Sequence, residues 1–170
     1  MYLAIVVAVL LVLAYFFVDW NRWKDFYPTI QFYIMCNLLY NFIFFNHTLW
    51  AYNPSTSWLN HSIIDLTFSL IIIPIILMIY LKYIPKAFKN ALFYILAWVA
   101  NFTVTEYFFQ RAGLFIYENG WGIFNSAFFN VIMFSVLGLH FKRPLHAILL
   151  SIPIIAILLF FHHPSFGDLK

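Results

Sequence analysis

The sequence is poor in charge. Of its 170 residues only 9% are Asp, Glu, Lys or Arg, whereas 65% are hydrophobic and 23% are aromatic. A soluble domain carries about 25% charged and about 45–50% apolar residues. A water-soluble fold of this composition has too few polar side chains to cover its surface. A soluble protein is therefore excluded, and lipid must solvate most of the chain.

Cysteine is nearly absent, and Cys36 is the single one. One cysteine excludes a disulfide framework and a thiolate metal site. It lies in an apolar run, where a thiol stays protonated and is a poor nucleophile. The HExxH, GxSxG and paired-histidine helical motifs of hydrolases and metalloenzymes are also missing. These absences favour a binding or transport role over catalysis, and no cofactor can be named from the sequence.

What the chain has in abundance is long apolar runs. A membrane-spanning helix needs about 20 mostly apolar residues. The segments that meet this requirement are, approximately, Tyr2–Val18, Thr29–Leu49, Ser62–Leu81, Ala91–Gln110, Ile123–Leu139 and Leu145–Phe161. No repeat, linker or low-complexity tail interrupts them. The sequence thus predicts an all-α fold in which residues 1–170 form one domain, a bundle of six transmembrane helices. If the first or last segment lies in the membrane interface, five helices remain.

The basic residues are unevenly divided between the connections. The connections after the first, third and fifth segments hold Arg22, Lys24, Lys82, Lys86, Lys89, Lys142 and Arg143. The opposite side holds only Arg111 and Lys170. Because cytoplasmic loops are enriched in Lys and Arg, we predict that both termini face outward in a multi-pass protein of the cell membrane. The formal charge of +3 is then a topology signal, and no nucleic-acid partner is expected.

The few polar side chains gather near the predicted outer ends and middles of the helices. His61 and Asp65 are four residues apart and share one helix face. Glu106 lies roughly 6 Å below the outer end of the fourth segment. The inner halves of the later segments carry no charge, so a dead-end pocket that opens outward fits better than a pore. We expect this ligand-binding pocket to be formed by Asn41, His47, His61, Asp65, Asn101, Glu106, Arg111, Glu118, Trp121, Asn125 and Asn130.

The stretch "GLFIYENGWG" connects the fourth and fifth segments. Asn-Gly is a favoured tight-turn dipeptide, which predicts a turn at Asn119-Gly120. We expect this loop to fold back over the pocket, with Glu118 or Trp121 at its rim.

Several interpretations of the cluster remain open at this level. An ionisable residue in a membrane helix is costly, so Asp65 and Glu106 should face the bundle interior. A small polar or cationic ligand is one reason to keep them there. A structural alternative pairs His61 with Asp65 and Arg111 with Glu106 or Glu118, with the Asn side chains joining helices. A proton relay is a further alternative, although the inner halves offer no carboxylate to continue it.

A membrane-embedded enzyme is another alternative. The candidate metal ligands are His47, His61, Asp65 and Glu106, which supply the nitrogen and oxygen donors that divalent metals bind. Such a metal would polarise a lipid or another ester or phosphate. Ligands scattered over separate helices are a weak signal for a metal site. A partner subunit with a purely structural role also fits the sequence.

The patterns "DWNRWKDFYPT", "LLYNFIFFNHTLW", "ENGW…FN…MF" and "LHFKRPL" cover nearly the whole chain. In these the sequence resembles a family of small uncharacterised multi-pass membrane proteins of endospore-forming Firmicutes, relatives of Bacillus and Clostridium. The resemblance implies a bacterial host and a location in the cytoplasmic membrane or the spore inner membrane. It implies no activity, because these motifs carry no known chemistry.

Overall fold

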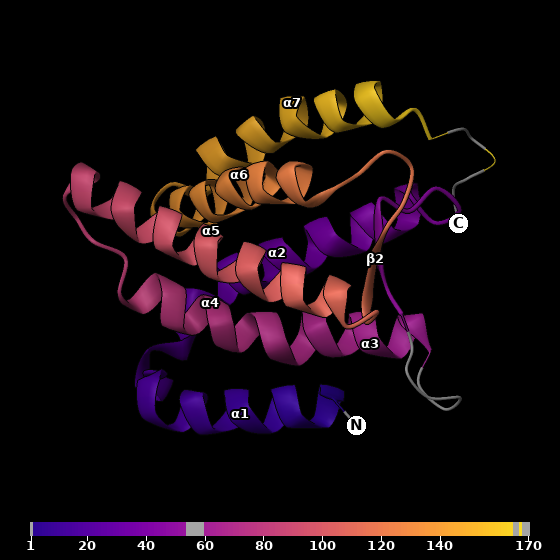
Figure 1. Cartoon of the computed structure of the whole chain (residues 1–170). Helices are drawn as coiled ribbons and strands as arrows, with labels where there is room; N and C mark the ends of the chain where they lie inside the picture. Colours follow the sequence, from indigo (N-terminus) through magenta and orange to yellow (C-terminus); the bar gives the residue numbers. More distant parts are fainter. Residues whose placement is uncertain (1, 54–59, 165–166, 168–170) are drawn as a thin grey trace.

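A computed structural model of the chain describes residues 2–53, 60–164 and 167, and these residues form a helical bundle (Figure 1). The α-helices are α1 (Tyr2–Phe17), α2 (Trp23–Ile43), α3 (His61–Thr67), α4 (Ile73–Lys82), α5 (Phe88–Arg111), α6 (Ile123–Lys142) and α7 (Pro144–His162). A short 3-10 helix, η1 (Trp20–Arg22), precedes α2, and a π-helical segment, η2 (Phe68–Ile72), joins α3 to α4. The all-α prediction is thus confirmed.

Two very short strands, which the sequence pattern did not predict, pair at one end of the bundle. These are β1 (Trp50–Tyr52) and β2 (Phe115–Tyr117), antiparallel, with Ala51 opposite Ile116. We call this end the strand end; α1 begins there and α7 ends there (Figure 1). The opposite end, which we call the basic end, carries the α1–α2, α4–α5 and α6–α7 connections. The seven basic residues assigned above to those connections therefore gather at one end of the molecule.

Among the residues that the structure describes, four helices are long and apolar enough to cross a membrane: Ser62–Lys82, Phe88–Arg111, Ile123–Lys142 and Pro144–His162. A fifth span is added if Leu3–Phe17 and Trp20–Ile43, which are bent by 89° to each other, are counted as one. The six spans expected from the sequence are therefore not confirmed. The 16 residues of α1 measure about 24 Å, short of the roughly 30 Å hydrocarbon core. The amide and charged side chains of α2 lower its mean hydropathy, so α2 is not counted as a span by itself.

The second helix differs most from the sequence-based boundaries. The predicted segment was Thr29–Leu49, whereas α2 begins six residues earlier, at Trp23, and ends at Ile43. Pro28 lies inside the helix and does not start it. The chain turns back after Ile43, and the Tyr40 hydroxyl accepts hydrogen bonds from the backbone N–H groups of Leu49 and Trp50, at 3.0 and 3.3 Å. His47 therefore lies in a loop and not on a helix.

The third span, Ser62–Lys82, contains the π-helical segment because of its proline. Pro74 has no N–H, and its ring excludes the carbonyl group four residues before it, so the α-helical hydrogen-bond pattern cannot continue through this turn. The N–H of Ile73 accordingly bonds to the carbonyl oxygen of Phe68, five residues back. The helix continues through this break, so α3, η2 and α4 form one rod.

The core near the basic end is aromatic. Tyr80 is fully buried, and its hydroxyl donates to the carbonyl oxygen of Phe134 at 2.8 Å. The Tyr94 hydroxyl donates to the carbonyl oxygen of Tyr80 at 3.0 Å, and the ring of Trp98 packs against both tyrosine rings. The cluster of Tyr80, Tyr94 and Trp98 therefore fills the space between α4, α5 and α6.

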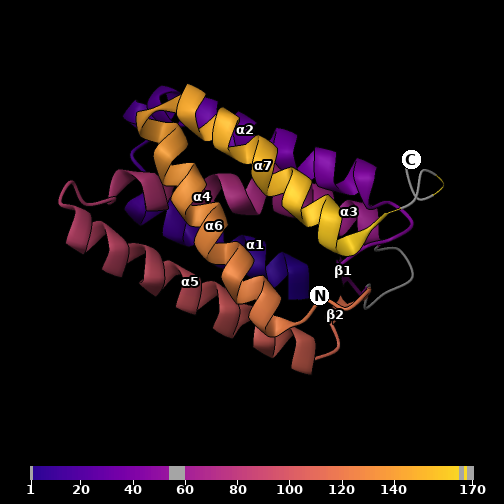
Figure 2. The ribbon, with the colours of Figure 1, turned by 90° about the horizontal axis from the view of Figure 1, so that it is seen from above.

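Figures 1 and 2 show α5, α6 and α7 side by side, with α6 in the middle.

Candidate functional site

A cavity of about 620 Å³ lies inside the bundle, between the strand end and the aromatic core. Side chains from α1, α2, the α3–α4 rod, α5, α6 and α7 line it, together with β1 and β2. Most of the lining is aliphatic or aromatic. Two carboxylates, Asp65 and Glu106, are part of the wall, and no Lys, Arg or His occurs among the described lining residues. We call this space the acidic cavity.

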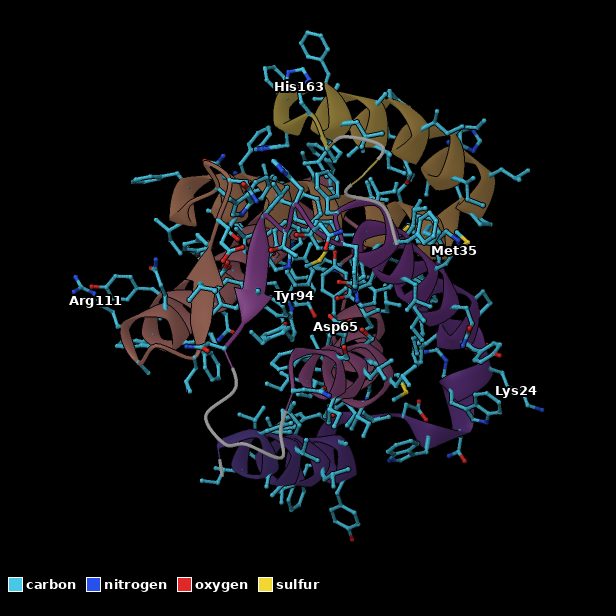
Figure 3. The ribbon with its side chains drawn as sticks, turned by 90° about the vertical axis from the view of Figure 1, so that its right-hand side faces the viewer. Lys24, Met35, Asp65, Tyr94, Arg111 and His163 are labelled. Atoms are coloured by element: carbon cyan, nitrogen blue, oxygen red, sulfur yellow. The ribbon has the colours of Figure 1, made fainter. Side chains whose placement is uncertain are left out.

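Asp65 is held by two amides from the neighbouring helix α2. Asn41 Nδ2 donates to Asp65 Oδ2 at 2.8 Å, and Asn37 Nδ2 lies 3.4 Å from Asp65 Oδ1. Asn37 also donates to Ser69 Oγ at 2.8 Å. Each of these pairs is one helical turn apart, Asn37 with Asn41 on α2 and Asp65 with Ser69 on the rod, so the two faces match. Figure 3 places Asp65 inside the ring of helices.

Glu106 is held by residues of two other elements, β2 and α6. The Tyr117 hydroxyl of β2 donates to Glu106 Oε1 at 2.9 Å, and Ser126 Oγ of α6 donates to the same oxygen. Asn130, one turn further along α6, also lies within hydrogen-bonding reach of this carboxyl group. Trp121 Nε1 lies 3.4 Å from Ser126 Oγ and supports it from behind. The carboxyl group of Glu106 is thus held in place from β2 and α6.

The partners of Glu106 are all neutral. No ion pair with this side chain occurs among the residues that the structure describes, and the groups around it are two hydroxyls and an amide. Burial, and secondarily the adjacent carboxyl group of Glu106, raise the pKa of the Tyr117 hydroxyl above its usual value. Tyr117 therefore stays protonated at neutral pH and remains a hydrogen-bond donor. Glu106 accordingly brings a carboxyl group, and no compensating basic side chain, to the cavity wall.

Four of the expected site residues line the acidic cavity: Asp65, Asn101, Glu106 and Asn130. Asn41 is not among the lining residues, but it donates a hydrogen bond to Asp65. Both carboxylates face the bundle interior, as expected from the cost of exposing them to lipid. The side chain of His61 lies outside the described part of the structure, so its expected pairing with Asp65 has no geometry to report.

Arg111 and Asn125 are not part of the cavity. Arg111 is exposed, donates from Nε to the Tyr107 hydroxyl at 3.1 Å, and points away from the bundle (Figure 3). Five residues of α-helix rotate a side chain by about 140°, so Arg111 cannot share the face of Glu106. The same rotation separates Asn125, which is exposed, from the buried Asn130. The expected pairing of Arg111 with Glu106 or Glu118 does not form.

Glu118 and His47 belong to the covering loops. Thr48 Oγ1 donates to the exposed Glu118 at 2.9 Å, and Asn119 Nδ2 donates to the carbonyl oxygen of Thr48 at 2.7 Å. His47 is half-buried in the same loop and does not line the cavity. The rings of Trp121 and Trp50 are 5.1 Å apart. The connection after α5 therefore folds back onto residues 48–50. Neither Glu118 nor Trp121, which were expected at the rim of the pocket, lines the cavity.

Tyr117 and Ser126 were not anticipated as site residues. Ser126 lies four residues before Asn130 on α6, so helical spacing alone would have placed it on the same face. Tyr117 offered no such signal, because it reaches Glu106 from a three-residue strand whose pairing is a tertiary feature. Asn37 is also part of the wall, through its bonds to Ser69 and Asp65.

A metal centre finds no support in the described residues. No three His, Cys, Asp or Glu side chains lie close enough together there to hold a metal ion. Asp65 and Glu106 bind separate sets of partners, and His47 lies in the covering loop away from the cavity lining. The metal-ligand set suggested by the sequence is therefore not assembled in the described part of the chain.

Comparisons with known proteins found no matching family model, no matching curated protein and no matching solved structure.

Proposed function

We propose that this chain is an integral membrane protein that binds a small polar or cationic ligand in the acidic cavity. The observation that carries this proposal is Glu106, a half-buried carboxyl group in a largely apolar cavity whose partners are all neutral. Placing an acidic side chain within a membrane helix costs about 2.5–3.5 kcal/mol on insertion scales. A cation about 4 Å away contributes about 4 kcal/mol of attraction at an effective dielectric constant of 20. This gross attraction is comparable in size to the cost of keeping the group charged, so a bound cation favours the charged form.

The residues of the acidic cavity have different roles in this proposal. Asp65 and Glu106 supply negative charge, and Asn101 and Asn130 supply neutral hydrogen bonds to polar parts of the ligand. Asn41 acts indirectly, since its bond to Asp65 Oδ2 fixes the direction of that carboxylate. The volume of about 620 Å³ lies within the range of about 300–1,000 Å³ that small-molecule sites occupy.

We further propose that the basic end lies in the cytoplasm and the strand end outside, in a bacterial cytoplasmic membrane or spore inner membrane. Seven basic residues at the basic end support this orientation through the positive-inside rule. The helices α1 and α7 begin and end, respectively, at the strand end, which supports termini that both face outward. The acidic cavity then lies in the outer half of the membrane, and the aromatic core closes it from the cytoplasm.

A purely structural role makes a different prediction. The hydrogen bonds of Asp65 join α2 to the α3–α4 rod, and those of Glu106 join α5 to β2 and α6. If helix joining is their entire purpose, neutral amides at both positions change stability but no added compound interacts with the protein through them. Ligand-dependent stabilisation separates this role from the proposed one.

The test is thermal stability of the purified protein in detergent, against a panel of divalent ions, polyamines and head-group analogues. The variants are Asp65→Asn and Glu106→Gln, with Asp25→Asn as the matched control, because Asp25 is an exposed acid paired with Arg22 at the basic end. A ligand at 100 times its Kd adds about 2.7 kcal/mol. We expect a cation to stabilise the wild type and Asp25→Asn, and to lose this effect in Glu106→Gln. Equal responses in all variants, or none in any, would contradict the proposal.

A further inference from the structure

We infer that the ligand is an amphiphilic organic cation, an ammonium group that carries an apolar substituent. This inference rests on the proposed function and specifies the ligand class of the same cavity. It is drawn from three properties of the wall: the position of Glu106 next to aromatic rings, the aliphatic remainder of the lining, and the size of the space.

Aromatic rings surround the groups that hold Glu106. The ring of Tyr117 lies 5.4 Å from that of Phe115, and the ring of Trp121 lies 5.1 Å from Trp50 and 6.1 Å from Phe129. Phe115, Trp50 and Phe129 all line the acidic cavity. Aromatic faces attract cations, and an aromatic wall around a carboxylate is the arrangement that recognises quaternary and other organic ammonium groups. A strongly hydrated ion gains less from such a wall, because it must first lose its water.

The rest of the lining is aliphatic. Ile73 and Ile76 from α4 and Ile154, Ile155 and Leu158 from α7 contribute only hydrocarbon to the wall. A polyamine carries its charges along its whole length and would set some of them against these side chains. A single ammonium group with an apolar substituent matches both parts of the wall, because burial of the substituent against hydrocarbon is favourable.

The size of the cavity favours the same ligand class. A volume of about 620 Å³ equals the space of about 20 water molecules at roughly 30 Å³ each, far more than one metal ion fills. Calcium takes about six to eight oxygen ligands. The described residues bring together no three side chains of the kind that hold a metal. A bare inorganic cation would therefore leave most of the apolar wall uncovered.

The experiment is a binding titration, by thermal shift and calorimetry, with an alkyltrimethylammonium series from tetramethylammonium to octyltrimethylammonium. Each compound is paired with a neutral isostere in which carbon replaces the charged nitrogen. Spermidine and magnesium chloride serve as the hydrophilic cations. All titrations use the full-length protein in the same detergent, as wild type, Glu106→Gln, Trp50→Leu and the exposed-site control Asp25→Asn.

We expect affinity to rise with alkyl length, the neutral isosteres to bind at least tenfold more weakly, and Glu106→Gln to remove this preference for charge. Trp50→Leu keeps the site apolar but removes a ring, and we expect it to weaken the cations roughly two- to thirtyfold while sparing the isosteres. If Glu106→Gln fails to fold, the comparison of cation with isostere on the wild type decides the question.

Three results would overturn the inference. If spermidine or magnesium binds in a Glu106-dependent manner and alkyl length has no effect, the proposed function stands and the amphiphilic ligand is wrong. If the isosteres bind as tightly as the cations, the site recognises apolar molecules and charge plays no part. If no cation of any kind binds, the proposed function fails together with this inference.

Discussion

At the residue scale, the behaviour of the molecule centres on how Glu106 is held. Its carboxyl group accepts bonds from Tyr117 and Ser126, which belong to elements on either side of a loop. A tyrosine hydroxyl is protonated at neutral pH, and burial raises the pKa of Tyr117 further, so it remains a donor. Hydrogen bonds to a charged group contribute more than neutral ones, and losing a donor leaves part of the carboxylate unsatisfied.

We expect Tyr117→Phe and Ser126→Ala each to lower the free energy of unfolding by about 1.5–3 kcal/mol, the usual range for a bond to a charged acceptor. Tyr107→Phe is the matched control, since the Tyr107 hydroxyl bonds to the exposed Arg111 at the surface. Denaturant titration in detergent measures all three. Equal stability of Tyr117→Phe, Ser126→Ala and the control would show that the Glu106 bonds contribute nothing.

Gly138 gives a second residue-scale prediction, on the packing of α6 against α4. A Cβ added there would lie 2.9 Å from Ile84 Cδ1 and 3.1 Å from the Tyr80 hydroxyl oxygen. Ile84 can rotate away, but Tyr80 is fixed by its 2.8 Å bond to the carbonyl oxygen of Phe134. We expect Gly138→Ala to cost about 1–3 kcal/mol through overpacking. Gly122→Ser, where a Cβ meets nothing within 4 Å, should leave the melting temperature nearly unchanged; a similar loss in both variants would contradict this account.

At the element scale, the strand pair connects two loops that cover the acidic cavity. Trp50 of β1 and Phe115 of β2 both line it, so the register of this pair decides which rings face the cavity. The bonds of Thr48 to Glu118 and of Asn119 to Thr48 continue the same contact beyond the strands. The cover of the acidic cavity therefore consists of the two paired strands together with the loops that flank them.

The register is testable by crosslinking. Ala51 and Ile116 are direct partners across the pair, and directly opposed residues of antiparallel strands lie close enough for a disulfide. We expect Ala51→Cys/Ile116→Cys to form an intramolecular disulfide on mild oxidation, in a Cys36→Ala background. Ala51→Cys combined with Phe88→Cys, at the opposite end of the bundle, is the control. Electrophoresis under non-reducing conditions distinguishes them, and absence of the crosslink would show that the strands do not pair in this register.

The helices were largely predictable from the sequence, and the loops were not. Apolar runs located the later spans within a few residues, and the cost of exposing a carboxylate to lipid predicted that Asp65 and Glu106 face inward. The start of α2 was missed because the charged residues Lys24 and Asp25 in its first turn indicated a loop. Pro28 indicated the start of a helix, whereas it lies inside α2. The strands were missed because three residues show no clear alternation, and their pairing depends on residues far apart in the chain. Arg111 and Asn125 were misplaced because depth in the membrane was considered without helical rotation.

At the scale of the whole molecule, basic residues are concentrated at one end of the bundle. Lys24, at the basic end, and Arg111, at the strand end, both point outward in Figure 3, whereas Asp65 lies inside. Lys82 bonds from Nζ to the carbonyl oxygen of Phe17 at 2.9 Å, so one of the basic residues also caps the end of α1. Most basic residues thus lie at one end of the molecule, whereas Asp65 and Glu106 line the acidic cavity away from that end.

The orientation prediction belongs to this scale. We expect cysteines introduced singly near each terminus of a Cys36→Ala protein to react with membrane-impermeant maleimide added to intact cells. Cysteines introduced at Lys86 or Arg143 should react only after the cells are opened. Protection of the C-terminal position in intact cells would contradict the outward-facing termini.

The most direct test of the acidic cavity uses the chain's own cysteine, because the half-buried Cys36 is free and lines the cavity. The measurement is the rate at which this thiol reacts with a cationic and with a size-matched anionic methanethiosulfonate reagent, applied to the outer face of right-side-out vesicles. The ratio of the two rates is compared with that of free cysteine. We predict a ratio well above that of free cysteine, unchanged in Asp25→Asn and sharply reduced in Glu106→Gln. A ratio equal to that of free cysteine, or one that Glu106→Gln leaves unchanged, would contradict the account of an outward-facing cavity that selects cations.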